Sequence, residues 1–211
     1  LSNSQYEKFV DFFRDSIKIL DCTFGVQNNL KKSLDQLCSE AEIAVREGYK
    51  HLILSDKKIS ECRAVIPMVL AFGAINSKLV NLGIRGFASI NVQTGETLDT
   101  HSFAVLLGIG ATTINPYLAF DSIYQRYEKK LFGKFSYEEC VRRYIKSVDN
   151  GLLKIMSKMG ISVLSAYRGG CNFETVGLSR AVVAEYFPGM ISRISGIGIF
   201  GIEKKIKTIH K

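Results

Sequence analysis

Apolar residues recur along the chain in two alternating patterns, short continuous runs and longer stretches at helical spacing. The short runs predict strands at residues 17–20, 52–54, 87–92 and 111–114. The longer stretches predict helices over residues 30–45, from near Pro67 to Gly83, over 101–107, and from Asn115 and Pro116 towards Lys130. Strand and helix therefore alternate, and Gly, Asp or Pro marks the short loops between them.

This alternation predicts an α/β fold of repeated β/α units with mainly parallel strands and helical crossovers. Buried parallel strands are apolar throughout, and the run Leu52, Ile53 and Leu54 fits that description. The pattern is compatible with an open α/β sheet and with a (β/α) barrel.

A second region begins after residue 135. Ser136 is suited to cap a helix, with Glu139 as its capping-box partner, and apolar residues keep helical spacing as far as Met159. Gly160 is a natural residue to follow the helix end, and residues 161–164 then predict a strand. The next segment is polar and rich in glycine. Because loops after the carboxyl ends of parallel strands form active sites, chemistry is expected there first.

Arg168 is the most informative side chain in this segment. A guanidinium binds a carboxylate or a phosphate through two hydrogen bonds, and Gly169 and Gly170 let backbone N–H groups approach a ligand. Two interpretations stay open: Arg168 binds an anionic ligand, or it pairs with Glu174 and ties down a loop.

Other candidates are weaker. Gly196, Gly198 and Gly201 match G-x-G-x-x-G, but a dinucleotide site also needs a preceding strand, a following helix and a later acidic residue. We favour a glycine-rich turn between packed segments. Asp56, after the predicted strand 52–54, either serves a site or caps the next segment. The histidines at 51, 101 and 210 are too dispersed to predict a metal site, and Cys171 is the only cysteine in the candidate loop.

Composition narrows the class of protein. The chain has 211 residues, of which 46% are hydrophobic and 23% charged, as in an ordinary globular protein. Its longest apolar run, residues 64–75, is too short to cross a bilayer, so no membrane association is expected. The formal net charge is +8, but no aromatic residues interleave the basic run at 203–207, so a generally basic protein is favoured over a nucleic-acid binder.

Five widely spaced cysteines without a CxxC pair fit reduced thiols and a cytoplasmic location. The sequence opens on Leu1 rather than Met, so we expect the gene product to begin upstream.

Residues 151–162 read GLLKIMSKMGIS, and this segment resembles a signature of glutamate synthase large subunits. Further ordered matches to that family occur downstream at residues 167–169, 173–174, 176–178, 186–187 and 192–194. Upstream matches lie at 19–21, 40–42, 52–56, 66–67, 94–96, 108–111 and 115–119. The resemblance covers nearly the whole chain.

The resemblance implies a fragment of an enzyme that forms L-glutamate from 2-oxoglutarate and glutamine-derived ammonia. In that family FMN reduces 2-iminoglutarate, and an iron–sulfur cluster relays electrons from an NAD(P)H-oxidising small subunit or from ferredoxin. Residues 1–132 are then the later part of the central domain, a rudimentary barrel-like unit. Residues 133–211 are the truncated start of the FMN-binding (β/α) barrel.

The resemblance also implies which residues face FMN and 2-oxoglutarate. These are Ser165, Tyr167, Arg168 and Gly169, with Glu174 linking substrate binding to the ammonia path. The signature residues Met156, Ser157 and Lys158 are weaker candidates, whose place at a helix end suits packing. The chain departs from a common form of the motif at Ala166, Cys171 and Asn172.

The family's amidotransferase nucleophile and its cluster cysteines have no counterpart in this sequence. We therefore expect the fragment to be inactive alone, to bind no FMN by itself, and to self-associate through residues 133–211. The alternative is a non-catalytic scaffold between domains.

Overall fold

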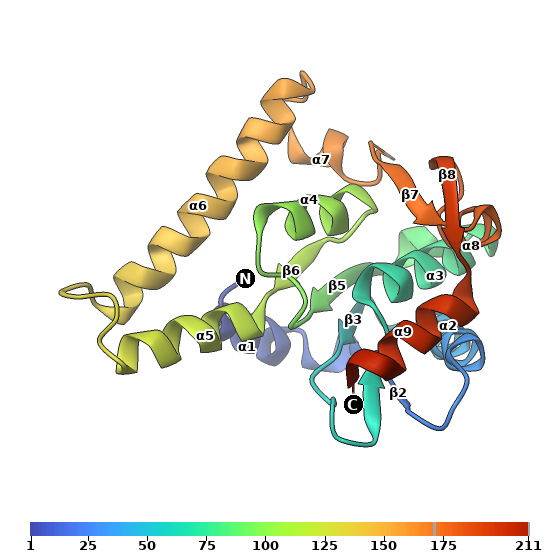
Figure 1. Cartoon of the computed structure of the whole chain (residues 1–211), viewed down its shortest axis with the longest axis horizontal. Coiled ribbons are helices and arrows are strands. Elements are labelled where there is room, and N and C mark those ends of the chain that lie inside the picture. The colour runs from blue at the N-terminus through green and yellow to red at the C-terminus, as the bar shows by residue number, and fades with distance from the viewer. Residues whose placement is uncertain (171, 211) are drawn as a thin grey trace.

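The computed structural model describes residues 1–170 and 172–210. Helices and strands alternate along most of the chain, which confirms the predicted α/β class (Figure 1). No helix in this described part is long and apolar enough to cross a membrane.

Four parallel strands form the main sheet, in the order β1-β3-β5-β6. The strands are β1 (Ile17–Asp21), β3 (His51–Ser55), β5 (Ser89–Gln93) and β6 (Thr113–Asn115). All four predicted strands are confirmed, although β5 starts later than expected because Arg85–Phe87 form a 3-10 turn. The sheet is open at both ends.

One face of the sheet is apolar and carries the main core. Helices α2 (Leu30–Arg46), α3 (Met68–Asn81) and α4 (Thr100–Gly108) pack there, each where the sequence predicts a helix. Leu52, Ile90 and Val92 point into this core and are essentially inaccessible to water. Fully burying one such side chain stabilises the fold by about 1.5–3 kcal/mol. Gly48 and Gly83 follow α2 and α3 with positive φ, as helix-ending glycines do.

The opposite face of the sheet is polar, and α1 (Asn3–Phe12) lies against it. Ser55 donates to the Gln93 amide oxygen at 2.8 Å, and Gln93 donates to Asn115 at 3.2 Å. Asn115 in turn donates to the Leu1 carbonyl at 3.1 Å and to the Asn3 side chain at 3.0 Å. Because every member has a partner, this polar ladder is buried without leaving unsatisfied groups.

A small antiparallel pair, β2 (Thr23–Gly25) and β4 (Arg63–Val65), lies beyond the carboxyl end of β1. A second 3-10 turn, Arg14–Ser16, precedes β1. Arg63 donates to the Asp21 carboxylate and to the Thr23 hydroxyl, both at 2.9 Å. This bond network ties the pair to the end of the sheet.

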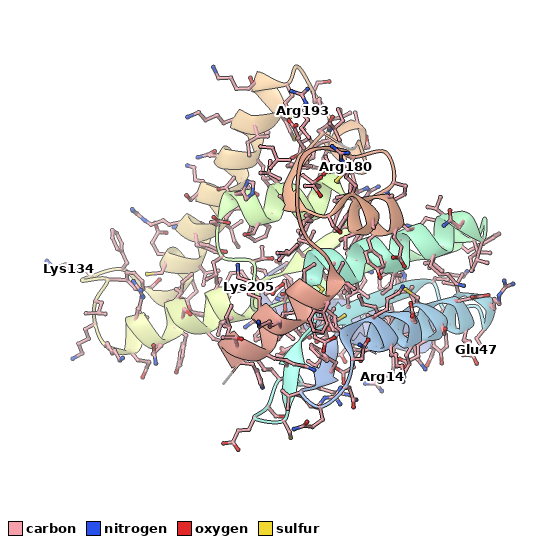
Figure 2. All side chains as sticks on the ribbon, turned by 45° about the vertical axis from the view of Figure 1, so that its right-hand side comes forward. Arg14, Glu47, Lys134, Arg180, Arg193 and Lys205 are labelled. Carbon is pink, nitrogen blue, oxygen red and sulfur yellow. The ribbon has the colours of Figure 1, made fainter. Side chains whose placement is uncertain are left out.

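Helices α5 (Tyr117–Glu128) and α6 (Tyr137–Lys158) form a hairpin, and α6 leans away from the body (Figure 1). The Ser136 hydroxyl accepts from the Glu139 amide at 3.3 Å, so the predicted N-cap is confirmed. Gly160 follows the helix with φ +70°, also as expected. Lys134 marks the tip of the hairpin (Figure 2).

The remaining chain forms α7 (Leu164–Tyr167), β7 (Glu174–Leu178), α8 (Arg180–Tyr186), β8 (Ile191–Ile197) and α9 (Ile199–His210). Strands β7 and β8 are parallel and make a separate two-stranded sheet. Helix α9 then returns to the first unit, where Glu203 accepts from the Leu30 amide at 2.8 Å. This carboxylate satisfies a free N–H group at the start of α2.

The predicted strand at residues 161–164 is wrong. Val163 has extended backbone angles, φ −130° and ψ 140°, but α7 begins at the next residue. A strand needs a neighbour to satisfy its N–H and C=O groups, and none of the described strands lies beside this segment. The strands described here also form no closed barrel, so the sheet is open or partial.

Candidate functional site

The segment expected to carry chemistry starts as a short helix, which is followed by a turn at Arg168 and Gly169. Ser165 and Tyr167 belong to α7 rather than to a loop, and Arg168 ends that helix. Gly169 takes φ +72°, a conformation that L side chains rarely adopt. Asn172 and Glu174 lie beyond this turn, whereas Cys171 lies outside the described residues.

Tyr167 points into the protein. Its side chain is 1% exposed, and its hydroxyl donates to the Ala104 carbonyl of α4 at 3.1 Å. Burial raises the pKa of the Tyr167 hydroxyl above its ordinary value. The Phe173 ring meets the Tyr167 ring edge-on, with centroids 6.3 Å apart. Tyr167 therefore fixes the segment to α4.

Arg168, Ser165 and Gly169 face solvent. Within residues 1–170 and 172–210, Arg168 has no ion pair with a carboxylate. Burial lowers the pKa of the Arg85 guanidinium, and the nearby positive charge of Arg168 lowers it further. Arg85 itself donates to the neutral acceptors Asn76 and Ala88. An exposed guanidinium with a second positive charge in its neighbourhood favours an anion.

Glu174 does not pair with Arg168, so the interpretation of a loop-tying Arg168–Glu174 pair is not supported. Glu174 starts β7, and its carboxylate meets the Arg193 guanidinium of β8 at 3.1 Å. Both side chains are well exposed, so this pair contributes at most about 1 kcal/mol. Sequence reasoning missed it because the partner lies 19 positions later, in a strand it had not placed.

Met156, Ser157 and Lys158 form the last turn of α6. Met156 is buried and belongs to the main core, which supports the packing role considered for it. Ser157 and Lys158 are exposed. Of the three signature residues, Met156 alone is buried.

Asp56 lies at the other candidate position, after the carboxyl end of β3, and is 1% exposed. Its carboxylate accepts from the Thr94 hydroxyl at 2.5 Å and from the Gly95 amide at 3.0 Å. Asp56 thus ties the turn after β5 to the end of β3, and it makes no cap of the segment that follows it.

Glu96 is a neighbour of Asp56 that sequence reasoning missed. Its carboxylate accepts from the Met68 amide at 2.7 Å, at the start of α3. Burial raises the pKa of Glu96, the bond from Met68 opposes that shift, and the charge of Asp56 adds to it. The available signal was that Asp56 directly follows β3 and that Glu96 lies in the turn after β5, at the same edge of the sheet.

The G-x-G-x-x-G motif has the strand and helix that the fingerprint requires, since it joins β8 to α9. A side chain at Gly196 would meet the Gly177 carbonyl at 2.1 Å, so this glycine permits close contact between β7 and β8. A side chain at Gly198 would meet only the Ser179 hydroxyl, at 3.6 Å. Packing therefore accounts for Gly196, in agreement with the favoured interpretation, whereas Gly198 makes no close contact.

In the part of the chain described here, no three His, Cys, Asp or Glu side chains converge into a metal-binding group. The cysteines at 22, 38, 62 and 140 are all free thiols. Burial raises the pKa of the Cys22 thiol well above its ordinary value, with the charges of Asp56 and Asp21 adding to the effect. Such a thiol is inert as a nucleophile.

Comparison with known proteins gives a consistent picture. A family model described as the glutamate synthase central domain matches residues 1–179. The large chain of NADPH glutamate synthase from Azospirillum brasilense is 49% identical over 213 residues, covering 100% of this chain and 14% of that protein. The corresponding large chain from Bacillus subtilis (strain 168) is 38% identical over 211 residues, with the same two coverages.

A plant relative also matches. The chloroplastic ferredoxin-dependent glutamate synthase of Oryza sativa subsp. japonica is 40% identical over 212 residues, covering 93% of this chain and 13% of that protein. The chain therefore spans about one seventh of the length of these curated relatives.

Proposed function

Because this chain belongs to the glutamate synthase central domain family, we propose that it is part of a glutamate synthase large chain. That enzyme would form L-glutamate from 2-oxoglutarate and glutamine-derived ammonia. The observation that carries the proposal is the family match over residues 1–179, together with relatives aligned along the whole chain. The segment alone would be inactive.

We propose that residues 1–132 are the later part of the central domain and that residues 133–211 open the FMN-binding barrel. The change in architecture supports a division: the four-stranded sheet is complete before α6, and a new parallel pair, β7 and β8, follows it. The family match continues to residue 179, and therefore across this division. The boundary at 132 stays a prediction.

Within the second part, we propose that Arg168 binds an anionic group of 2-oxoglutarate or FMN, and that Ser165 and Gly169 line the same surface. Support comes from their exposure and from the nearby Arg85 charge. Glu174 keeps its proposed link to the ammonia path, although the Glu174–Arg193 pair would have to open for Glu174 to contact substrate.

The residues present fit FMN only in part. Arg168 and the backbone of Gly169 suit a phosphate, and the bound flavin would supply hydride transfer. The iron–sulfur cluster needs cysteine thiolates held together, whereas the described cysteines lie apart. We therefore place the cluster ligands elsewhere in the parent enzyme, whose electron donor would be an NAD(P)H-oxidising subunit or ferredoxin.

The test is glutamine-dependent formation of glutamate from 2-oxoglutarate by the full-length gene product. Replacing Arg168 with Ala should raise the KM for 2-oxoglutarate about tenfold or more, because a bidentate contact is lost. Arg180→Ala is the matched control, since Arg180 is also an exposed arginine and begins α8 (Figure 2). Absence of activity with every electron donor would reject the proposal.

The second candidate is a purely structural scaffold. The return of α8 and α9 onto α2 and α3 favours it, since Ser77 donates to the Tyr186 carbonyl at 3.1 Å and Glu203 caps α2. The visible spectrum of the purified chain can exclude the scaffold. A flavin band at about 450 nm would exclude a pure scaffold. We expect a colourless protein.

A further inference from the structure

Tyr167 and Phe173, the aromatic residues on either side of Arg168 in sequence, both contact helix α4. Ala104 and Gly108 lie four residues apart and therefore on one face of the helix. The Tyr167 hydroxyl is bonded to the Ala104 carbonyl at 3.1 Å. The Phe173 ring lies against Gly108, where any added side chain would meet it at 2.1 Å.

We propose that Tyr167 and Phe173 form an aromatic clamp that attaches their segment to α4 and thereby positions Arg168 and Gly169. Gly108 provides the space on α4 for the Phe173 ring. The consequence for substrate rests on the proposed function, whereas the clamp itself does not. Tyr167 and Phe173 are positioning residues, because neither presents a polar atom to solvent beside Arg168.

The contacts explain why the segment takes one conformation. The Arg168 amide donates to Leu164 at 2.9 Å, and the Gly170 amide donates to Tyr167 at 3.2 Å. Both bonds are accepted by carbonyl groups of α7, so they orient Arg168 only if α7 is held in place. The edge-on contact between the Tyr167 and Phe173 rings joins the two attachment points.

Helix α4 is itself held at its N-terminal end, which makes it a firm support. A side chain at Gly151 of α6 would meet the Thr100 side chain at 2.5 Å, so α6 and α4 are in close contact. The Tyr144 hydroxyl donates to the Leu98 carbonyl at 3.2 Å, just before α4. The clamp therefore links the proposed site to the region of residues 1–132.

Gly108 offers the sharpest variant. Alanine favours helices more than glycine does, and Gly108 does not have a positive φ, so Gly108→Ala should leave α4 intact. The added methyl group would nevertheless displace the Phe173 ring. Gly86→Ala is the matched control, since a side chain there meets nothing within 4 Å and its φ is not positive either.

Hydrogen exchange of the chain, read over residues 164–170, tests the clamp without any ligand. Gly108→Ala and Phe173→Ala should exchange about tenfold faster or more, and Tyr167→Phe about fivefold faster, because one hydrogen bond is lost. Trypsin cleavage after Arg168 should accelerate in parallel. Gly86→Ala should match the wild type, and exchange in β3 and β5 should show that every compared variant is folded.

Unchanged exchange over 164–170 in folded Gly108→Ala and Tyr167→Phe would overturn the clamp. In the full-length enzyme, Tyr167→Phe should raise the KM for 2-oxoglutarate and leave the KM for glutamine unchanged. If 2-oxoglutarate does not slow hydrogen exchange over residues 164–170 of the wild type, the proposed substrate contact is rejected. The clamp is not affected by that result, because the exchange rates of the variants test it separately.

Discussion

Tyr167 and Arg168 are neighbours in sequence, yet their side chains lie in opposite environments. Tyr167 is buried against α4, whereas Arg168 is exposed. A tyrosine with a bonded hydroxyl stabilises the interior, and an exposed guanidinium that has no ion pair among the described residues is available to an anion. Tyr167, which was expected to face the ligands, therefore has a structural role of its own.

Asp56 is expected to matter for stability. Replacing it with Ala leaves the Thr94 hydroxyl and the Gly95 amide without their buried acceptor. The free energy of unfolding should fall by about 2–4 kcal/mol, as measured by urea denaturation. Asp15→Ala, at an exposed position, should change it by less than about 0.5 kcal/mol. Equal losses in the two variants would contradict a special role for Asp56.

His51 should make stability depend on pH. Its ring packs against Phe9 and Phe13, and its Nδ1 lies 2.8 Å from the Ser89 hydroxyl. Burial lowers the pKa of His51 below its ordinary value of 6.5, and the charge of Lys50 adds to this. A depressed folded-state pKa gives stability that is present above 6.5 and lost as the pH falls through the folded pKa.

The measurement is the free energy of unfolding between pH 7.5 and about pH 5. In His51→Gln the free energy of unfolding should fall less towards acid pH than in the wild type. In His101→Gln, at an exposed position, it should fall as in the wild type. The same pH dependence in wild type and His51→Gln would refute the assignment.

At the scale of elements, close contact between two strands explains the presence of Gly196, which matching the G-x-G-x-x-G motif could not explain. Strands β7 and β8 approach each other at Gly177 and Gly196, and Gly177 has φ +80°. The strand–turn–helix context of a dinucleotide fingerprint is present, but its first glycine is used by the neighbouring strand. Packing between the two strands accounts for Gly196 without a ligand.

Two variants of this motif should therefore behave differently. Gly196→Ala places a methyl group against the Gly177 carbonyl and should destabilise the chain by about 1–3 kcal/mol. Gly198→Ala meets only the Ser179 hydroxyl at an ordinary distance and should cost less than about 1 kcal/mol. Thermal denaturation of both variants checks this, and the reverse order would point to a role for the turn itself.

At the scale of the whole molecule, the two-stranded sheet is the least protected part. Parallel sheets are normally covered on both faces, and isolated pairs of strands are marginal. Val176 and Ile194 are paired neighbours across β7 and β8, and they are 65% and 62% exposed. Ile191 and Ile197 extend the same exposed apolar set along β8.

We expect this surface to drive self-association of the chain. Ile194→Lys should lower the apparent mass in light scattering at high concentration, because a charge opposes burial of the surface. Leu153→Lys is a control of equal exposure, 62%, on α6 and should have no effect. A clean monomer for the wild type at high concentration would contradict the expectation.

The sequence by itself determined the repeated β/α units, the helix ends at Gly48, Gly83 and Gly160, and the N-cap at Ser136. These depend on apolar spacing and on neighbours within a few residues. The family likewise could be recognised from ordered motifs, without any coordinates.

Only the tertiary structure decided the partners of individual side chains. Residues 161–164 have strand-like composition, yet no described strand lies beside them, and Leu164 starts a helix instead. Glu174 pairs with Arg193, and Tyr167 turns towards Ala104, which lies 63 positions earlier in the chain. Such contacts depend on how distant elements pack, and apolar periodicity carries no information about that.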